Sequence, residues 1–328
     1  MRGCRVALRA LFFAISLSMP VAVQAQDVGT WPNRAVRVVV PYAPGNTGDI
    51  SFRQIQPILE TKLGTRFLID NKAGASGNIG AEEVVRAKPD GYTLLLGATN
   101  NYVTNQHLIR GMRFDPLRDL APITMVSNAP SVVVVGESMQ AADLKGLAAL
   151  AAKASPALAY GSPGIGTPPH LAAELLRQLA GVELVHVPYK GSPPAVQGLI
   201  NNETQLYVTA FSSVAAMVKA GRLKALAVAG DSRLAALPDV PTSAEQGFPA
   251  LRTGNWWGLS APSGTDAELI QRIALATREA LADPGVRERY KDLGLTAVGN
   301  SPAEFADQMR REAAVWKQVI DKAGLAAN

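Results

Sequence analysis

The chain has 328 residues, of which 48% are hydrophobic, 18% charged and 6% aromatic. This composition excludes a disordered or collagen-like protein, and the length predicts about two domains, each large enough to bury its own core. Residues 1–25 are typical of a cleaved signal peptide, because Arg2, Arg5 and Arg9 precede the apolar run Ala10–Leu17 and a small-residue ending. Without those three arginines, 29 basic residues face 27 acidic ones, so we expect no nucleic-acid partner.

Cysteine and histidine usage argues against a metal or a disulfide. The single cysteine, Cys4, lies in the predicted signal peptide, so the mature chain has no thiol. The three histidines, His107, His170 and His186, are unrelated in spacing. We therefore predict no metal site and no cofactor. No later stretch reaches the roughly 18 apolar residues of a membrane span, which predicts a protein released in soluble form after export.

The first half of the mature chain alternates strands with helices, and a polar or glycine-rich loop follows each strand. We predict strands at Ala35–Pro41, Phe67–Asp70 and Tyr92–Gly97, and helices at Ile50–Leu63 and from Ile79 to about Ala87. Asp49 is the predicted N-cap of the first helix. The sequence Ala98–Asn101 is predicted to be a polar loop.

Beyond Pro122 the pattern restarts as a second α/β unit. We predict strands at Ser131–Gly136, Ala157–Tyr160, Val182–Val187, Gln205–Thr209 and Ala225–Ala229, and helices at Asp143–Ala154, Leu171–Ala180, Pro194–Asn201 and Ser213–Ala220. A strand at Asn255–Ala261 crosses back, and helices follow at Asp266–Ala282, Pro284–Leu293 and Pro302–Ala323. Strands that alternate with helices predict parallel sheets.

Three loops carry the chemistry. Gly45–Gly48, Gly74–Gly77 and Gly164–Thr167 each place backbone N–H groups where a helix begins, and helix N-termini favour carboxylates. Glycine in one such loop can serve only to turn the chain, but three of them together favour an anion site. Tyr42 and Tyr189 stand beside turns and suit either the cleft or the core, whereas Trp256 and Trp257 are predicted to be core residues.

Enzymatic alternatives have weaker support. A hydrolase could combine Ser162 or Ser76 with His170 or His107, but neither serine stands in a Gly-x-Ser-x-Gly turn. A dinucleotide site is disfavoured because Pro169 occupies the third glycine position of the fingerprint that Gly164 would open.

Six motifs in order give the chain a family resemblance from Trp31 to about Leu325. They are Trp31-Pro32-Asn33-Arg34 followed by residues 38–45, the segment Asp70–Gly80, Pro89–Leu95, Tyr160–Gly164, Val187–Gly191 and Leu237–Thr242. With these motifs the chain resembles the Bug family of extracytoplasmic solute receptors, the periplasmic components of tripartite tricarboxylate transporters. Each motif alone is weak, and their shared order over the full length is the strong signal.

The resemblance implies a two-domain periplasmic binding protein of the Venus flytrap type, α/β, with parallel or mixed sheets flanked by helices and a cleft between the domains. Domain 1 would combine residues 27–128 with 252–328, and domain 2 would be residues 129–251. The resemblance implies a protein that is not an enzyme. It implies instead a periplasmic monomer that delivers a small carboxylate to a membrane permease. An exported hydrolase with His170 as base and a ligand sensor for a signalling partner stay as alternatives.

The resemblance also implies which residues hold the ligand. They are Gly45, Asn46, Thr47, Gly48 and Asp49 in the first loop, Ala75, Ser76, Gly77 and Asn78 in the second, Asn100 and Asn101 after the third strand, and Ser162, Gly166 and Thr167 from domain 2, with Tyr42 and Thr209 as further candidates.

Two positions depart from the family pattern. Asn46 stands where the first loop usually has its second glycine, and Thr209 stands where a strand usually ends in an aspartate that faces the cleft. A neutral Thr209 offers no partner for a ligand ammonium group. We therefore predict that α-amino acids bind less well than plain or aromatic carboxylates.

Overall fold

The computed structural model describes residues 31–230 and 232–322, so the predicted signal peptide at residues 1–25 lies outside the described residues. Ten strands are described within these ranges: β1 (Val36–Val40), β2 (Phe67–Asn71), β3 (Thr93–Ala98), β4 (Leu120–Gly136), β5 (Leu158–Ser162), β6 (Leu184–Pro188), β7 (Leu206–Ala210), β8 (Leu223–Ala229), β9 (Gly254–Pro262) and β10 (Thr296–Ala297).

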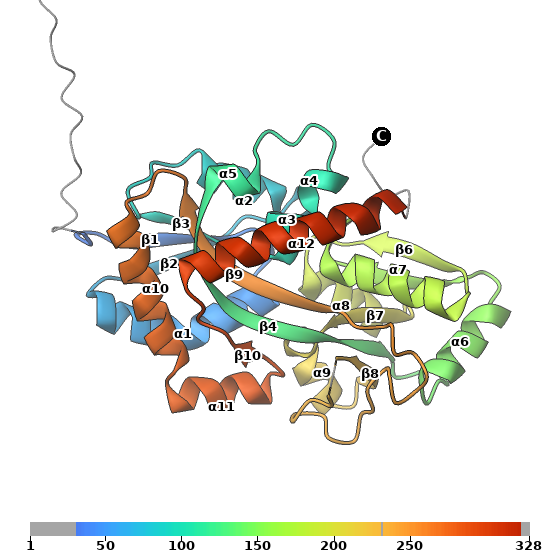
Figure 1. Ribbon diagram of the computed structural model, residues 1–328. Coiled ribbons are helices and arrows are strands. Elements are labelled where there is room, and N and C mark those ends of the chain that lie inside the picture. Colours follow the sequence, from blue (N-terminus) through green and yellow to red (C-terminus); the bar gives the residue numbers. More distant parts are fainter. Residues whose placement is uncertain (1–30, 231, 323–328) are drawn as a thin grey trace, which may run out of the picture.

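Helices connect most of these strands (Figure 1). The helices described are α1 (Thr47–Leu63), α2 (Asn78–Val85), α3 (Thr99–Val103), α4 (Asn105–Leu108), α5 (Pro116–Asp119), α6 (Leu144–Lys153), α7 (Pro168–Ala180), α8 (Ser192–Ile200), α9 (Ala215–Lys219), α10 (Ala267–Leu281), α11 (Pro284–Asp292) and α12 (Pro302–Lys322). Two single 3₁₀ turns, η2 (Ala75–Gly77) and η3 (Phe211–Ser213), precede α2 and α9.

One long strand joins two groups of strands. The sheet order is β2-β1-β3-β9-β4-β7-β5-β6, and β8 and β10 also pair with β4. The first part of β4, as far as Pro130, pairs antiparallel with β9, while Ser131–Gly136 pairs with β7 and β8. In Figure 1, β4 and β9 run side by side from one half of the molecule to the other. The predicted division into residues 27–128 plus 252–328 and residues 129–251 stays a prediction.

Both faces of the sheet are covered by helices, which explains the continuous valine runs. In β1, Val36, Val38 and Val40 pack in a core with α1, α10 and α11, while Val39 packs on the opposite face with α2, α3 and α12. The valines of β4 alternate in the same way, with α6 and α7 on one face and α8 and α9 on the other. A strand buried on both faces needs apolar residues at every position, not at every second one.

The sequence-based elements differ from the structure in three informative ways. The predicted strand at Ser131–Gly136 is the second part of a longer strand, because β4 begins at Leu120 and continues to Gly136. The predicted loop Ala98–Asn101 mostly forms the start of α3, capped by the Asn101 side chain, whose Oδ1 accepts from the Ala98 N–H at 2.9 Å. The short elements α4, α5 and β10 were not predicted. Among the described helices, none is both long and apolar enough to cross a membrane.

Candidate ligand-binding cavity

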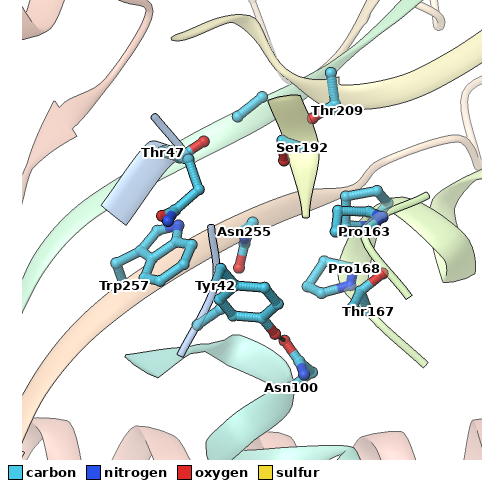
Figure 2. A pocket seen from close by; sticks show the side chains of 14 residues that line it. Tyr42, Thr47, Asn100, Pro163, Thr167, Pro168, Ser192, Thr209, Asn255 and Trp257 are labelled. Carbon is cyan, nitrogen blue, oxygen red and sulfur yellow. Dashed lines mark hydrogen bonds between the residues drawn. The ribbon is translucent and has the colours of Figure 1, made fainter. Parts of the chain in front are cut away.

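A small cavity opens where the two groups of strands meet, and loops that follow strand ends supply its walls (Figure 2). The first wall is formed by residues of β3 and β9, the loop after β1, and the first turns of α1 and α3. These residues are Tyr42, Asn46, Thr47, Ala98, Asn100, Asn255 and Trp257. The second wall is Pro163, Thr167, Pro168, Pro169, Ser192, Thr209 and Ala210, from β7 and the loops that follow β5 and β6. None of these described lining residues carries a charge.

Asn46 shapes the loop that enters α1. Its Oδ1 accepts from the Asp49 N–H at 3.1 Å and its Nδ2 donates to the Ala43 carbonyl at 2.7 Å. Asn46 is thus the N-cap of α1, and the prediction that Asp49 caps this helix is wrong. The Asp49 carboxylate instead accepts from the Gly45 N–H at 2.9 Å and pairs with Arg53 at 3.0 Å. Asp49 therefore holds the loop and does not line the cavity.

The loop before α2 is held by an unusual concentration of donors on one carbonyl. The Ser76 oxygen lies 2.8 Å from Asn100 Nδ2, 3.0 Å from the Tyr42 hydroxyl, 3.2 Å from Asn105 Nδ2 and 3.3 Å from Asn101 Nδ2. Ala75 and Ser76 both have left-handed φ values, 46° and 52°. Such backbone is unfavourable for residues with a Cβ, so these side chains stabilise a strained turn.

Tyr42 connects that turn to the cavity. Its hydroxyl lies 2.8 Å from Asn100 Oδ1 as well as near Ser76, and the residue is 5% exposed. Burial raises the pKa of the Tyr42 phenol well above its usual range, and its hydrogen-bonding contacts with Asn100 and Asn101 only partly oppose this. Tyr42 therefore stays protonated at neutral pH. Asn100 lines the cavity, but its amide nitrogen already donates to the Ser76 carbonyl and to Asn105 Oδ1.

The second wall is stiffened by prolines and by bonds within its own loop. Thr167 Oγ1 donates to the Gly164 carbonyl at 2.7 Å, and the N–H of Gly166 donates to His170 Nδ1 at 3.1 Å. Pro168 and Pro169 occupy the first turn of α7 and offer no N–H groups. Ser192 Oγ lies 3.1 Å from the Tyr207 hydroxyl. Hydroxyl groups are therefore the main polar side-chain groups of this wall.

Ser162 lies behind the second wall and pairs with His186. Its Oγ is 2.7 Å from His186 Nε2 and also contacts the backbone of Gly164, and the residue is fully buried. Burial, reinforced by the nearby His170, lowers the pKa of His186 to about 4. Ser162 does not line the cavity, so this serine–histidine pair supports the loop from behind. The hydrolase alternative considered His170 or His107 as the base for this serine, but the histidine that contacts Ser162 is His186.

Hydrogen bonds beside the cavity join the segments that carry the two walls. Thr47 Oγ1 lies 3.0 Å from Ser213 Oγ and 3.1 Å from Ser212 Oγ, Thr104 Oγ1 donates to the Gly166 carbonyl at 3.3 Å, and Ser76 Oγ donates to the Ile165 carbonyl. The free space that remains is about 20 Å³, little more than one water molecule occupies. A carboxylate can therefore enter only when the walls separate.

The structure brings six of the predicted residues to the cavity: Tyr42, Asn46, Thr47, Asn100, Thr167 and Thr209. The other ten do not line the cavity: Gly45, Gly48, Asp49, Ala75, Ser76, Gly77, Asn78, Asn101, Ser162 and Gly166. That any of these residues contacts a ligand stays a prediction. Tyr189 does not line the cavity, and its hydroxyl lies 3.1 Å from Glu203.

Sequence reasoning missed Ala98, Ala210, Ser192, Asn255, Trp257 and the three prolines. Two signals could have found part of this set. Ser192 is the first residue of α8 and follows a glycine in the loop after β6. Thr47 and Thr167 likewise stand at the start of a helix after a loop that contains glycine. Asn255 and Trp257 are two positions apart in a strand, so their side chains lie on the same face of the sheet, whereas Trp256 lies on the opposite face. Within the described residues, no group of three or more histidine, cysteine, aspartate or glutamate side chains could hold a metal ion.

A helix-covered α/β sheet whose two groups of strands share long crossing strands, with a cavity where they meet, defines the class of periplasmic binding proteins. The chain belongs to the tripartite tricarboxylate transporter family of receptors, TctC, which it matches over residues 51–325. This family consists of solute-binding receptors, as the sequence resemblance implied.

Known relatives are similar over almost their whole length. A UPF0065 protein from the tcbD-tcbE intergenic region of Pseudomonas sp. (strain P51) is 34% identical over 322 residues, which are 98% of this chain and 96% of the relative. The periplasmic binding protein BugD has 30% identity and a TM-score of 0.87, covering 91% of this chain and 100% of BugD. R. palustris Rpa4515, solved with adipate, has 32% identity and a TM-score of 0.87, covering 90% of this chain and 99% of Rpa4515.

Proposed function

We propose that this protein is exported to the periplasm, captures a small carboxylate in the cavity between the two walls, and delivers it to a tripartite tricarboxylate-type permease without chemical change. The observation that carries the proposal is the cavity itself, buried and uncharged yet rich in hydrogen-bond donors, in a receptor of this family. A related structure that contains adipate gives independent support for a carboxylate.

The donors in the walls suit an anion that is held without a cation. Hydroxyl groups of Thr47, Ser192 and Thr209 and the amide of Asn255 face the cavity. Thr47 is also the first residue of α1, whose N-terminus carries a partial positive charge. Neutral donors that bind a carboxylate form charge-assisted hydrogen bonds, and a helix N-terminus adds favourable electrostatics for the anion.

Capture would use movement of two domains, residues 27–128 plus 252–328 against residues 129–251. The contacts from Thr47 to Ser212 and Ser213 join these two parts directly. A ligand that touches both walls would favour this closed arrangement over an open one, which is a population shift between two states. The closed form would then be the one that the permease recognises.

Two alternatives use the same cavity. A hydrolase needs a nucleophile that reaches the ligand, and Ser162 is buried behind the second wall with its Oγ engaged. We therefore propose binding without turnover. A sensor that passes its closed form to a signalling partner would bind the same ligand. Deletion of the permease distinguishes a sensor from a transport receptor: the response to the ligand would be lost if the protein serves transport and would persist if it serves a signalling partner.

Calorimetric titration of the purified protein tests the proposal, with benzoate, adipate, malate and glutamate as probes. A micromolar ligand at millimolar concentration would raise stability by about 4 kcal/mol, which a thermal-shift screen detects first. We expect saturable binding of at least one carboxylate, recovery of that ligand unchanged by mass analysis, and weaker binding of glutamate. Failure of every carboxylate to bind would refute the proposal, and an altered ligand would indicate turnover.

A charged variant locates the binding. Thr209→Asp places a carboxylate in an uncharged cavity, and repulsion should weaken binding of a carboxylate that has no ammonium group about tenfold or more. Thr296→Asp, at an exposed position of β10, is the matched control and should leave affinity unchanged. Equal affinities of both variants and the unmodified protein would place the ligand elsewhere.

A further inference from the structure

Trp257 occupies a position that sets it apart from its neighbour Trp256. The two residues point to opposite faces of β9. Trp256 stacks on Tyr102 with ring centroids 5.4 Å apart, and its Nε1 donates to Glu312 at 2.8 Å. Trp257 lies on the cavity side, edge-on to Tyr42 at 5.5 Å, and is 3% exposed. Figure 2 shows its indole beside Tyr42 in the wall of the cavity.

The indole N–H of Trp257 is a buried donor that lacks an acceptor. Nε1 has no hydrogen-bond partner among the described residues. A buried donor without an acceptor costs about 1–3 kcal/mol, and tryptophan in a protein interior usually finds one. The unsatisfied donor therefore points to an acceptor that is supplied from outside the chain.

Gly48 shows that the first turn of α1 is fitted to this indole. A Cβ at position 48 would lie 2.2 Å from Trp257 Cε3. Glycine inside a helix costs about 1 kcal/mol relative to alanine. The need to admit the Trp257 ring explains this glycine, which stands next to Asp49 in the loop that departs from the family pattern.

The opposite wall matches a flat apolar body and not a second charge. Pro163, Pro168 and Pro169 face the cavity from the second wall and have neither an N–H nor a charge to offer. No arginine, lysine or histidine stands among the described lining residues to bind a second carboxylate. The cavity thus combines neutral donors from both walls with the Trp257 and Tyr42 rings on one side and the prolines on the other.

We infer that Trp257 is a specificity-determining residue: its Nε1 donates to an oxygen of the bound carboxylate ligand, and its ring packs along a flat apolar body. The ligand class that this arrangement selects is a monocarboxylate with an aromatic or similarly flat apolar body, in preference to a dicarboxylate. This inference rests on the proposed carboxylate-binding function and deepens it.

Calorimetry with benzoate and adipate tests the inference on matched variants. Trp257→Phe keeps an aromatic ring and removes the donor, and Trp256→Phe makes the same change on the opposite face of β9. We expect the unmodified protein to bind benzoate more tightly than adipate. Trp257→Phe should weaken benzoate binding about tenfold, and Trp256→Phe should change it less than about threefold.

The outcomes separate this inference from the proposed function. If the unmodified protein binds no carboxylate, the proposed function fails and the inference fails with it. If it prefers adipate, or if Trp257→Phe keeps its benzoate affinity within about twofold, the inference fails while the proposed function stands.

An NMR measurement on the unmodified protein tests the inference even if Trp257→Phe does not fold. In protein labelled with ¹⁵N-tryptophan, one indole N–H resonance should move downfield on addition of benzoate, and the same resonance should persist in Trp256→Phe. An unchanged set of indole resonances at saturating benzoate would overturn the inference.

Discussion

The two walls of the cavity are built from different chemistry. The first wall presents amides, a threonine and two aromatic rings, and much of its polar capacity is already used on its own backbone, as the contacts of Asn46 and Asn100 show. The second wall presents three prolines and hydroxyl groups, with a serine–histidine pair hidden behind it. Both walls therefore offer neutral donors, but the first wall adds aromatic rings and the second wall adds rigid prolines.

The largest expected effect comes from a steric clash introduced beneath the first wall. In Gly77→Ala the new Cβ would lie 2.5 Å from Asn101 Nδ2 and 3.0 Å from the Tyr42 hydroxyl, at a residue with φ of 85°. We expect a loss of about 2–4 kcal/mol in the free energy of unfolding, from strain and steric overlap together. Urea denaturation measures it.

Gly64→Ala is the matched control for that variant. Gly64 also has a left-handed φ, 68°, but no atom outside its immediate neighbours lies within 4 Å of the place that an alanine Cβ would take. Only backbone strain remains, and the loss should be about 1 kcal/mol. Equal losses in the two variants would show that the donor cluster around Ser76 does not constrain Gly77.

Removal of one hydroxyl from the first wall gives the next largest effect. Tyr42→Phe leaves the Asn100 Oδ1 acceptor without its donor in a buried site and should destabilise the protein by about 1–3 kcal/mol. Tyr92→Phe removes a hydroxyl from an exposed bond to Asn33, and should cost less than about 0.5 kcal/mol. Chemical denaturation of both variants checks this, and a Tyr42→Phe value as small as the control would contradict the described network.

The second wall should respond to acid. The pKa of His186 is lowered to about 4 by burial and by the neighbouring His170, against an ordinary value of 6.5. The unfolded chain therefore takes up a proton below about pH 6.5 while the folded chain does not, so stability should fall as the pH drops from about 6.5 to about 4. After allowance for partial exposure of the ring, the loss is on the order of 1–2 kcal/mol.

Denaturation at pH 7 and pH 5 measures that loss, and His186→Phe isolates its source. Phenylalanine keeps a ring against Tyr160 and His170 but does not titrate. The difference between the two pH values should shrink in this variant. His170 also has a pKa lowered by burial, so a smaller dependence should persist. An unchanged dependence would assign the effect to other groups.

The smallest expected effect concerns the contact between the walls. Thr47→Val keeps the side-chain shape and removes the hydroxyl that contacts Ser212 and Ser213. Closure should weaken by about 0.5–1 kcal/mol, and ligand affinity should fall about two- to fivefold. Calorimetry measures the affinity, with Thr61→Val as control because the Thr61 hydroxyl donates within its own helix, to the Pro57 carbonyl. A tighter-binding Thr47→Val would contradict a closed ligand-bound form.

Local pattern predicted most of the fold. The valine run of β1 and the capped helix after Asp143 are governed by neighbours in sequence, so the prediction and the structure agree closely there. The continuity of β4 through Pro122 could not be read from the sequence, because pairing with the distant β9 holds that segment extended. Proline and polar residues there suggested a break.

The cavity was predicted less completely because its walls depend on long-range packing. Asn46 and Thr47 follow a strand in a glycine loop and were found by that local signal. Trp257 is more than 200 residues away, and only the missing side chain of Gly48 shows why an indole fits there. Ser162 was predicted to bind ligand, but its pairing with His186 across β5 and β6 places it behind the wall.

A crystal structure of the protein with the tightest-binding carboxylate from the calorimetric panel tests directly whether the ligand binds between the two walls. The account predicts the ligand between the two walls, its carboxylate within hydrogen-bond distance of first-wall donors and its body against the prolines of the second wall. A carboxylate bound outside this cavity, or one that contacts a single wall with the other turned away, would contradict the account.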